Sequence, residues 1–428
     1  MGESSIVRAL VVALLAATPG CYLSHRAETP AEPPPESDCP AALQLGAPAP
    51  MPGYCPTRER RSVYPIPERV PESRWVLDLP VEVGTQRPIV VGPRGRIYLP
   101  AGGQLLAVDD LGAEGRLAWM VEVGGAFRGP FLLRDGSLLL VAFAPPDDTE
   151  AIWLDAAGAV TQRVPLEGRT TDAAVDARGG IVRSVRTEDD RAVIVRHDAD
   201  GAVDWRSAPF EHAWARFALG RAGEVFVGEA AGSFDPGPAT LTALDGETGD
   251  PRWAVELDPE AQLTGGPSVG SDGAVRAVLW TDGSTTTTLA TVGPDGELRR
   301  AALPEEPWGG GVHGLSVAAD GTAYVKEGRA LMAVAPGGEI RWQRDAHPNI
   351  DLGTTLDPDG ALLIGGGGHT RLDGADGAER WVSAIEAHSE PTPGGGVRIH
   401  FPGVATVGDG VLYYMASDAR LQAVGPPR

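Results

Sequence analysis

The chain has 428 residues, and acidic side chains outnumber basic ones so far that its formal net charge is −22 at pH 7. This balance argues against nucleic acid as a partner, because a phosphate-binding surface needs clustered Lys and Arg, and no such cluster stands out. The hydrophobic fraction of 42% is enough for a buried core, and 57 Gly with 38 Pro are typical of short strands and tight turns.

The first 20 residues have the pattern of a lipoprotein signal peptide. Arg8 precedes a short apolar run, and Gly20 stands before Cys21, the expected lipid acceptor. The run is far shorter than the roughly 20 apolar residues of a membrane-spanning helix. A cleaved secretory signal with Cys21 incidental is the first alternative, and a wrongly assigned start residue is the second. We expect an exported, lipid-anchored envelope protein, in the outer membrane and facing the periplasm or the cell surface.

Residues 21–73 are expected to form the lipidated Cys followed by a tether. Their many prolines favour polyproline II, which extends by roughly 3.1 Å per residue. Cys39 and Cys55 are the two cysteines that remain. An even pair in an oxidising compartment predicts a disulfide, with two unrelated thiols as the alternative.

From Arg74 to Arg428 one pattern recurs, in which an apolar strand runs into a tight turn that contains Gly. The turn glycines lie 39 to 50 residues apart, and the residue four positions before each is aliphatic in seven of eight units. This period predicts an all-β fold, an eight-bladed β-propeller of four-stranded antiparallel blades. Seven blades are the alternative if the last unit is irregular. The turn glycines are Gly95, Gly136, Gly179, Gly223, Gly273, Gly321, Gly360 and Gly410.

The two ends of the repeat complement one another. The last unit, 404–424, has no Trp strand, whereas residues 74–79 form an orphan strand that contains Trp75. We expect the orphan strand to complete the last blade, because closing the ring removes its open edges.

The second half of the unit is clearest at residues 243–253, Ala-Leu-Asp-Gly-Glu-Thr-Gly-Asp-Pro-Arg-Trp. This segment resembles the PQQ-like repeat of the quinoprotein-alcohol-dehydrogenase-like propellers, which occurs in enzymes and in binding scaffolds. The repeat Trp is expected to pack between neighbouring blades. Two units depart from the pattern, with Arg163 and Arg299 near the Trp position. Related turns precede Trp119, Trp205, Trp342 and Trp381.

The resemblance raises the question of quinone chemistry. Quinoprotein dehydrogenases typically hold calcium beside the quinone with Glu, Asn and Asp, and many carry a disulfide between adjacent cysteines. Here Cys55 is the last cysteine, and the sole Asn349 stands in a loop. We therefore expect no enzyme activity, no cofactor and no metal. The Asp-rich segment 198–204 lacks the bidentate Glu of a calcium loop and is expected to be a hairpin turn.

A set of aromatic, Arg and His residues falls in the connections that lead to the inner strands, on one face of the ring. Such residues are favoured at interfaces, although lining of the channel mouth explains them equally well, and the histidines could instead form a metal or acid–base site. The candidate binding face comprises Phe127, Arg128, His212, Trp214, Arg216, Trp308, His313, His347 and His388.

Function is expected to follow from the anchor and the propeller together. Both resemble the propeller lipoprotein of the outer-membrane β-barrel assembly machinery, from which the long linker and the strong acidity depart. The hypothesis is a non-catalytic scaffold that docks envelope proteins and is held at the membrane by its lipid. A ligand-binding surface sensor and a small-molecule enzyme acting at the central channel are the alternatives.

Overall fold

The structure of the chain is a computed structural model. The residues it describes are 39, 41–44, 46–83, 89–144, 148–213, 215–229, 238–281, 287–304, 312–327, 329–345, 354–365, 368–384, 388–391, 397–400 and 405–426.

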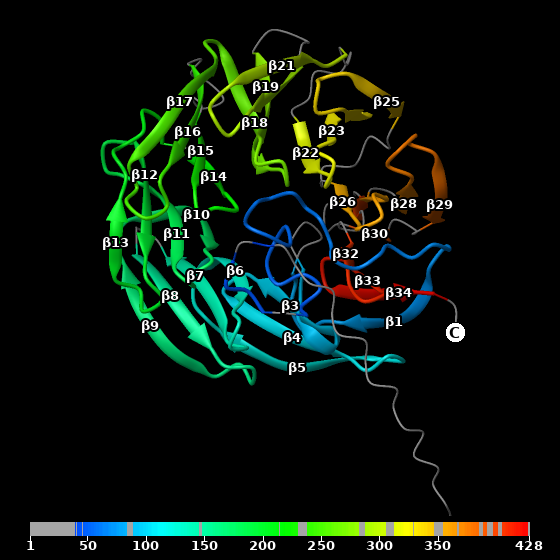
Figure 1. Ribbon diagram of the computed structural model, residues 1–428. Helices are drawn as coiled ribbons and strands as arrows, with labels where there is room; N and C mark the ends of the chain where they lie inside the picture. The colour runs from blue at the N-terminus through cyan, green and yellow to red at the C-terminus, as the bar shows by residue number, and fades with distance from the viewer. Residues whose placement is uncertain are drawn as a thin grey trace, which may run out of the picture. The chain divides into compact units, whose positions relative to one another are not determined.

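The described residues form eight four-stranded antiparallel sheets, arranged as blades in a ring (Figure 1). Blade 1 contains β2 (Val90–Val91), β3 (Arg96–Ala101), β4 (Gln104–Asp110) and β5 (Gly115–Glu122), with the short 3-10 turn η1 (Pro93–Gly95) after β2. Blade 2 contains β6 (Ala126–Leu132), β7 (Leu138–Ala144), β8 (Asp148–Leu154) and β9 (Val160–Leu166). Blade 3 contains β10 (Arg169–Val175), β11 (Ile181–Arg186), β12 (Ala192–His197) and β13 (Val203–Arg206).

The next blades repeat the same order from the inner to the outer strand. Blade 4 contains β14 (Ala215–Leu219), β15 (Val225–Glu229), β16 (Ala239–Leu244) and β17 (Pro251–Asp258). Blade 5 contains β18 (Ala261–Val269), β19 (Val275–Thr281), β20 (Thr287–Val292) and β21 (Leu298–Ala302). Blade 6 contains β22 (Val312–Val317), β23 (Ala323–Glu327), β24 (Ala330–Val334) and β25 (Ile340–Asp345). Blade 7 contains β26 (Thr354–Leu356), β27 (Leu362–Gly365), β28 (Gly368–Leu372) and β29 (Glu379–Ala384).

Blade 8 joins the two ends of the propeller. Its strands are β32 (Thr406–Val407), β33 (Leu412–Ser417), β34 (Arg420–Gly425) and, as the outer strand, β1 (Glu72–Asp78). Val76 pairs with Gln422 and Leu77 with Leu421. This pairing confirms the predicted closure and the count of eight blades. A separate hairpin of β30 (His388–Pro391) and β31 (Val397–His400) precedes blade 8.

All eight predicted turn glycines have a positive φ, as the tight turn between the first two strands requires. Gly136, with φ 89°, shows the geometry, because its N–H donates a 2.9 Å hydrogen bond to the carbonyl of Leu133. A residue with a Cβ adopts this backbone region at a steric cost. The periodic glycines therefore mark where each inner strand turns back.

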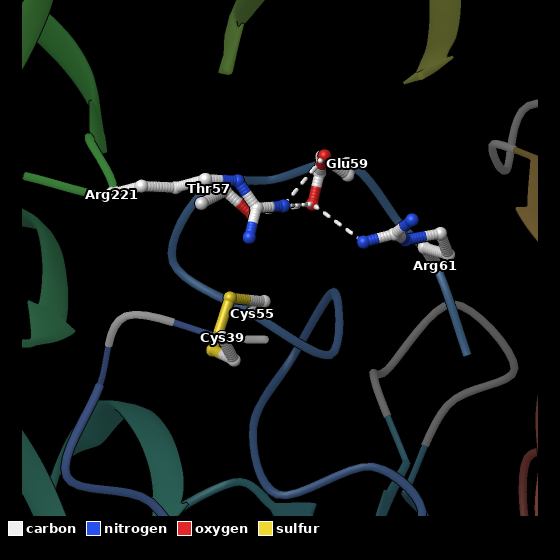
Figure 2. The surroundings of a disulfide bond; sticks show 6 residues. All are labelled: Cys39, Cys55, Thr57, Glu59, Arg61 and Arg221. Carbon is white, nitrogen blue, oxygen red and sulfur yellow. Dashed lines mark hydrogen bonds and ion pairs between the residues drawn. A yellow bond between two sulfur atoms is a disulfide. The ribbon is translucent and has the colours of Figure 1, made fainter. Parts of the chain in front are cut away.

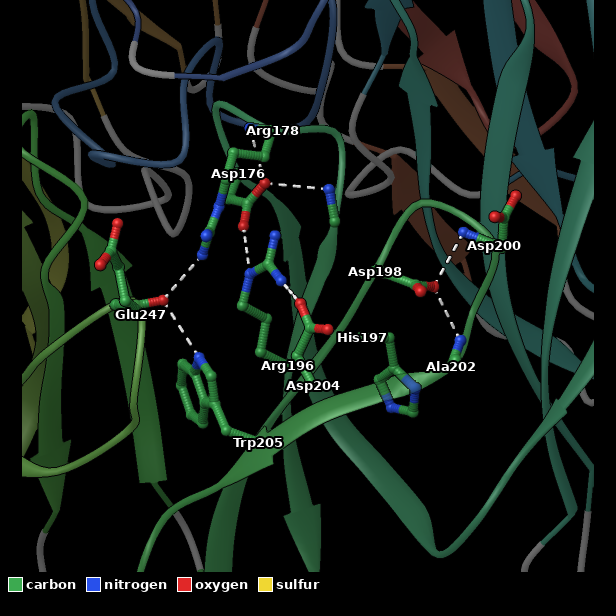
Figure 3. A network of polar contacts seen from close by, with 12 residues as sticks. Asp176, Arg178, Arg196, His197, Asp198, Asp200, Ala202, Asp204, Trp205 and Glu247 are labelled. Atoms are coloured by element: carbon green, nitrogen blue, oxygen red, sulfur yellow. Dashed lines mark hydrogen bonds and ion pairs between the residues drawn. The ribbon is translucent and has the colours of Figure 1, made fainter.

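The repeat tryptophans pack between neighbouring blades, as the sequence predicts. The indole N–H of Trp205 donates a 3.0 Å hydrogen bond to the carbonyl of Gly246 in blade 4 (Figure 3). Its ring also lies against Gly249, where an added Cβ would approach the ring to 2.5 Å. Equivalent indole hydrogen bonds reach the following blade from Trp75, Trp119, Trp253 and Trp342.

Blades 2 and 5, which lack the tryptophan, use smaller side chains at the same place. Val164 faces Gly201 of blade 3, and Ala301 faces Gly338 of blade 6. The sequence drew attention to Arg163, but its guanidinium pairs with Glu150 instead. An aliphatic contact thus replaces the indole where the repeat departs from its consensus.

Residues 41–66, named here the inner segment, do not form the extended tether that the sequence predicts for 21–73. They run inside the ring of inner strands (Figure 1) and hydrogen-bond to the ends of those strands. The N–H of Leu219 donates to the carbonyl of Pro56, Val269 to Thr57, and Val317 to Glu59. Leu356 donates to Arg60, Leu132 to Pro50 and Val91 to Ala49 in the same way.

The inner segment satisfies backbone groups that the ring leaves open. The inner strand of each blade has no neighbouring strand on its axial side, and a buried N–H without an acceptor is costly. Its partners lie at the carboxyl ends of the inner strands, next to the glycine turns. The inner segment is therefore part of the propeller, at the end of the ring that carries those turns.

The core lies between adjacent blades. One buried cluster joins Val90 and Tyr98 of blade 1 to Leu132 and Leu138 of blade 2. Similar clusters follow around the ring, as expected when each sheet packs face to face on the next. Within the described part of the chain, no helix has the length and hydropathy needed to cross a membrane.

Candidate functional site

A disulfide joins Cys39, which lies just before the inner segment, to Cys55 within it (Figure 2). The two Cα atoms lie 5.7 Å apart across a sequence separation of 16 residues. The predicted pairing is thereby confirmed. The disulfide lies immediately before Pro56, from which the segment begins its contacts with blades 4 to 7.

Glu59 ties the inner segment to blade 4 through buried charge. Its carboxylate pairs with Arg221 at 2.9 Å and with Arg61 at 3.9 Å (Figure 2). The hydroxyl of Thr57 donates a 3.2 Å hydrogen bond to the same carboxylate. Because a buried carboxylate is costly unless it is paired, this arrangement holds the segment in one position.

Arg58 points from the inner segment toward the inner strands of blades 3 and 4. Its guanidinium forms an ion pair with Asp172 of β10 and lies 5.7 Å from the ring centroid of Phe217 of β14. In the neighbouring blade 2, Arg128 of β6 donates a 2.6 Å hydrogen bond to the carbonyl of Thr171, the residue before Asp172. Three consecutive inner strands therefore bring charged groups together around Arg58.

Arg216 of β14 belongs to the same group of charges. Desolvation lowers the pKa of Arg216, and repulsion from Arg58 and Arg128 lowers it further, against the opposing effect of Asp172. Its side chain is nevertheless exposed to solvent. Burial and the charge of Arg58 likewise lower the pKa of Arg60.

The structure divides the candidate binding face. Phe127 is only 9% exposed and packs in the cluster between blades 1 and 2, which corresponds to the packing alternative for this residue. Arg128 and Arg216 stand near the beginnings of their inner strands. His212 lies in the connection between β13 and β14, where it is half-buried. Its backbone N–H donates a 3.5 Å hydrogen bond to the carboxylate of Glu229.

Several predicted residues lie outside the description. Cys21, Trp214, Trp308 and His347 are not among the described residues. His313 lies on β22 and His388 begins β30, but their side chains are not described.

Sequence reasoning missed Arg58, Arg60 and Asp172. Residues 57–61, Thr-Arg-Glu-Arg-Arg, were assigned to a solvated tether, so their guanidiniums were not expected near the inner strands. The available signal was topological, because the inner strands of any propeller leave backbone donors at the axis that another segment has to satisfy.

The Asp-rich segment after β12 is a hairpin turn, as expected. The carboxylate of Asp198 accepts hydrogen bonds from the N–H groups of Asp200 and Ala202 (Figure 3). This is the pattern of an Asx turn. Among the described residues, no group of three His, Cys, Asp or Glu side chains is placed to hold a metal ion.

His197 at the end of β12 is part of a buried network in blade 3. Its Nε2 accepts a 2.9 Å hydrogen bond from Nε of Arg183, and its Nδ1 lies 2.9 Å from the carbonyl of Gly201. This pattern makes the imidazole neutral, with the proton on Nδ1. Desolvation lowers the pKa of His197, and burial lowers the pKa of Arg183 to about 10. These hydrogen bonds join β11 to β12 and to the turn that follows β12.

Comparison with solved structures finds propellers of several activities. A quinohemoprotein alcohol dehydrogenase, ADHIIG from Pseudomonas putida HK5, matches with a TM-score of 0.60 and 14% identity over 93% of this chain and 84% of its own. BamB from Moraxella catarrhalis matches with a TM-score of 0.51 and 16% identity over 83% of this chain and 100% of its own. Sqt1 from Saccharomyces cerevisiae matches with a TM-score of 0.56 and 10% identity over 84% of this chain and 100% of its own.

At these identities the likeness concerns the fold, and enzymes stand beside BamB among the matches. No family model and no curated protein sequence matches the chain. The protein is therefore an eight-bladed β-propeller with the fold of the quinohemoprotein alcohol dehydrogenases and of BamB, as its PQQ-like repeat predicts.

Proposed function

We propose that this protein is a non-catalytic lipoprotein of the cell envelope whose propeller docks partner proteins, with outer-membrane protein assembly as its setting. The observation that carries the proposal is the position of the inner segment. It occupies the carboxyl ends of the inner strands of seven blades through main-chain hydrogen bonds, and Tyr54 reaches the eighth. The connections that lead into the inner strands lie at the opposite end and supply the docking face.

Export is supported by the disulfide. Cys39 and Cys55 are paired within a segment that the fold holds in place, and disulfides persist in oxidising compartments. The signal-like sequence before Cys21 accounts for export and for attachment to a membrane.

The docking face is the set of connections between the outer strand of one blade and the inner strand of the next. In the sequence, His212 and Trp214 fall in the connection from blade 3 to blade 4. Aromatic residues beside polar ones are enriched at protein interfaces. Arg128 and Arg216 stand slightly deeper, on the inner strands, and are not required for this proposal.

Cross-linking of the tagged full-length protein in its own membranes, followed by identification of what co-purifies, tests docking. We expect an envelope protein to be recovered with the wild type and lost with Trp214→Ala. The matched control is Trp253→Ala, which removes an inter-blade tryptophan and leaves the docking face unchanged. Equal recovery from Trp214→Ala and the wild type would place docking elsewhere.

Fractionation of Cys21→Ser tests the anchor separately. The variant is expected to leave the membrane fraction and remain exported, with its Cys39–Cys55 disulfide intact. A variant that stays in the membrane fraction would contradict lipidation at Cys21. This readout does not depend on any partner.

A further inference from the structure

Four guanidinium groups and one carboxylate meet inside the ring, and docking at the connections does not account for them. The arginine cluster is defined as Arg58 of the inner segment, Arg128 of β6 and Arg216 of β14, around Asp172 of β10, with Arg60 of the inner segment beside Arg58. One carboxylate against four guanidiniums leaves an excess of three positive charges. The protein as a whole carries −22, so this excess is local and opposite in sign.

The cluster is assembled from four separate parts of the fold. The inner strands β6, β10 and β14 belong to consecutive blades and contribute one charged side chain each. The inner segment brings Arg58 to Asp172, and the buried pair of Glu59 with Arg221 fixes the residue beside it. Rigid elements therefore hold these charges close together, where mutual repulsion would otherwise separate them.

Much of the hydrogen-bonding capacity of the cluster is unused. Asp172 engages Arg58, and the carbonyl of Thr171 engages Arg128. In the part of the chain that the structure describes, no acceptor is hydrogen-bonded to the guanidinium of Arg60 or Arg216. Each guanidinium offers five N–H donors in a planar fork that matches the oxygens of carboxylates and phosphates.

Arg216 also reaches solvent. Its aliphatic stem passes close to Gly266 of β18, where an added Cβ would lie 3.2 Å from Cδ, and the side chain remains exposed. Because this residue is exposed, a ligand from solvent can meet Arg216 without displacing the core.

We propose that the arginine cluster binds a small multivalent oxyanion, one that carries carboxylate or phosphate groups. Two or more anionic groups are needed to offset an excess of three charges. Placement on the inner strands, where the inner segment already lies inside the ring, favours a small molecule over an acidic protein segment. Charge-assisted, bidentate hydrogen bonds to guanidinium supply the affinity. The lowered pKa values of Arg60 and Arg216 agree with this, because repulsion that an anion relieves is present in the free protein.

Isothermal titration of the full-length protein with citrate and with pyrophosphate, at constant ionic strength, tests the proposal. We expect saturable binding of at least one of them at a single site. Arg216→Gln and Arg60→Gln should each weaken binding by about tenfold or more, the effect of losing a charged hydrogen bond. The control is Arg116→Gln on β5, where the side chain is 64% exposed and its carboxylate partner is 3.9 Å away. This variant should bind like the wild type.

Thermal unfolding of each variant verifies that it is folded before titration. Absence of saturable heat with both anions would overturn the proposal. Equal weakening by Arg216→Gln and Arg116→Gln would do the same, since it would indicate nonspecific attraction. Binding of a poly-glutamate peptide without binding of either small anion would replace the small molecule with a protein segment. None of these results depends on the cross-linking experiment, so the two proposals fail independently.

Discussion

The N–H of Val407 in blade 8 donates a 2.9 Å hydrogen bond to the hydroxyl of Tyr54 in the inner segment, although 353 residues separate them. Both residues are buried. At the equivalent place in six other blades, the N–H of the inner strand donates to a main-chain carbonyl of the inner segment. One side chain therefore completes the attachment of the segment to the last blade.

Tyr54→Phe should destabilise the protein, because it leaves the buried N–H of Val407 without an acceptor. The expected cost is about 1–3 kcal/mol in the free energy of unfolding. Tyr64→Phe is the control, since Tyr64 is only half-buried in the same segment. Urea unfolding of both variants measures the difference. Equal stability of Tyr54→Phe and Tyr64→Phe would mean that the hydroxyl does not hold the segment.

The contact between Trp205 and Gly249 predicts a difference between two glycine substitutions. Gly249 and Gly223 both have positive φ, 77° and 94°, so Ala strains the backbone at either position. Only at Gly249 does the added Cβ meet an indole ring, whereas at Gly223 nothing lies within 4 Å. Gly249→Ala should therefore be less stable than Gly223→Ala by about 1–3 kcal/mol, the cost of overpacking.

Thermal or urea unfolding of these two variants gives that comparison directly. Trp205→Phe, made separately, should lose the indole hydrogen bond to Gly246 at a cost of about 1 kcal/mol. If Gly249→Ala and Gly223→Ala are equally stable, the indole does not hold blades 3 and 4 together as described.

Removal of the disulfide should loosen the inner segment more than the blades. The Cys39–Cys55 link closes a loop with a separation of 16 residues, for which chain entropy predicts about 3 kcal/mol. The double variant Cys39→Ser, Cys55→Ser should be cleaved faster by trypsin at Arg58, Arg60 or Arg61, as mass spectrometry would show. Reductant should have the same effect on the wild type and none on the double variant. Unchanged cleavage would show that the main-chain contacts alone retain the segment.

His197 makes part of the stability depend on pH. Burial lowers its pKa below the ordinary value of 6.5, so the unfolded chain binds a proton at a pH where the folded protein does not. Stability from this group is complete above pH 6.5 and is lost as the pH falls from 6.5 toward the lowered pKa.

His197→Gln keeps an amide oxygen for Arg183 and removes the titration. Its urea midpoint should therefore fall less than that of the wild type between pH 7.5 and pH 5.5. The circular dichroism spectrum at pH 7.5 verifies that the variant is folded. A wild-type midpoint that is constant over this range would contradict the neutral imidazole.

The sequence was a good guide to the blades because their signals are local and repeated. Gly136 and its seven counterparts need positive φ, and Trp205 needs a glycine in the next blade to pack on, so these residues recur from one unit to the next. The replacement of the repeat Trp by Val164 in blade 2 was not recognised from the sequence, because an aliphatic residue in a strand has no distinctive pattern.

The inner segment could not be predicted in the same way. Its prolines indicate an extended chain, and its partners, such as Asp176 for Ala42, are far away in sequence. The arginine cluster depends on that placement. Arg58 meets Asp172 only because residues 56–61 follow the inner strands, so the sequence around Arg58 does not indicate its partners.

The most direct test of the docking account is site-specific photo-cross-linking in native membranes, with a photoreactive amino acid in place of His212 or of Asp135. His212 lies in a connection that leads into an inner strand, whereas Asp135 lies in a glycine turn at the other end of the ring. The account predicts a discrete cross-linked envelope protein from position 212 and none from position 135. The same product from both positions, or from position 135 alone, would contradict docking at the connections.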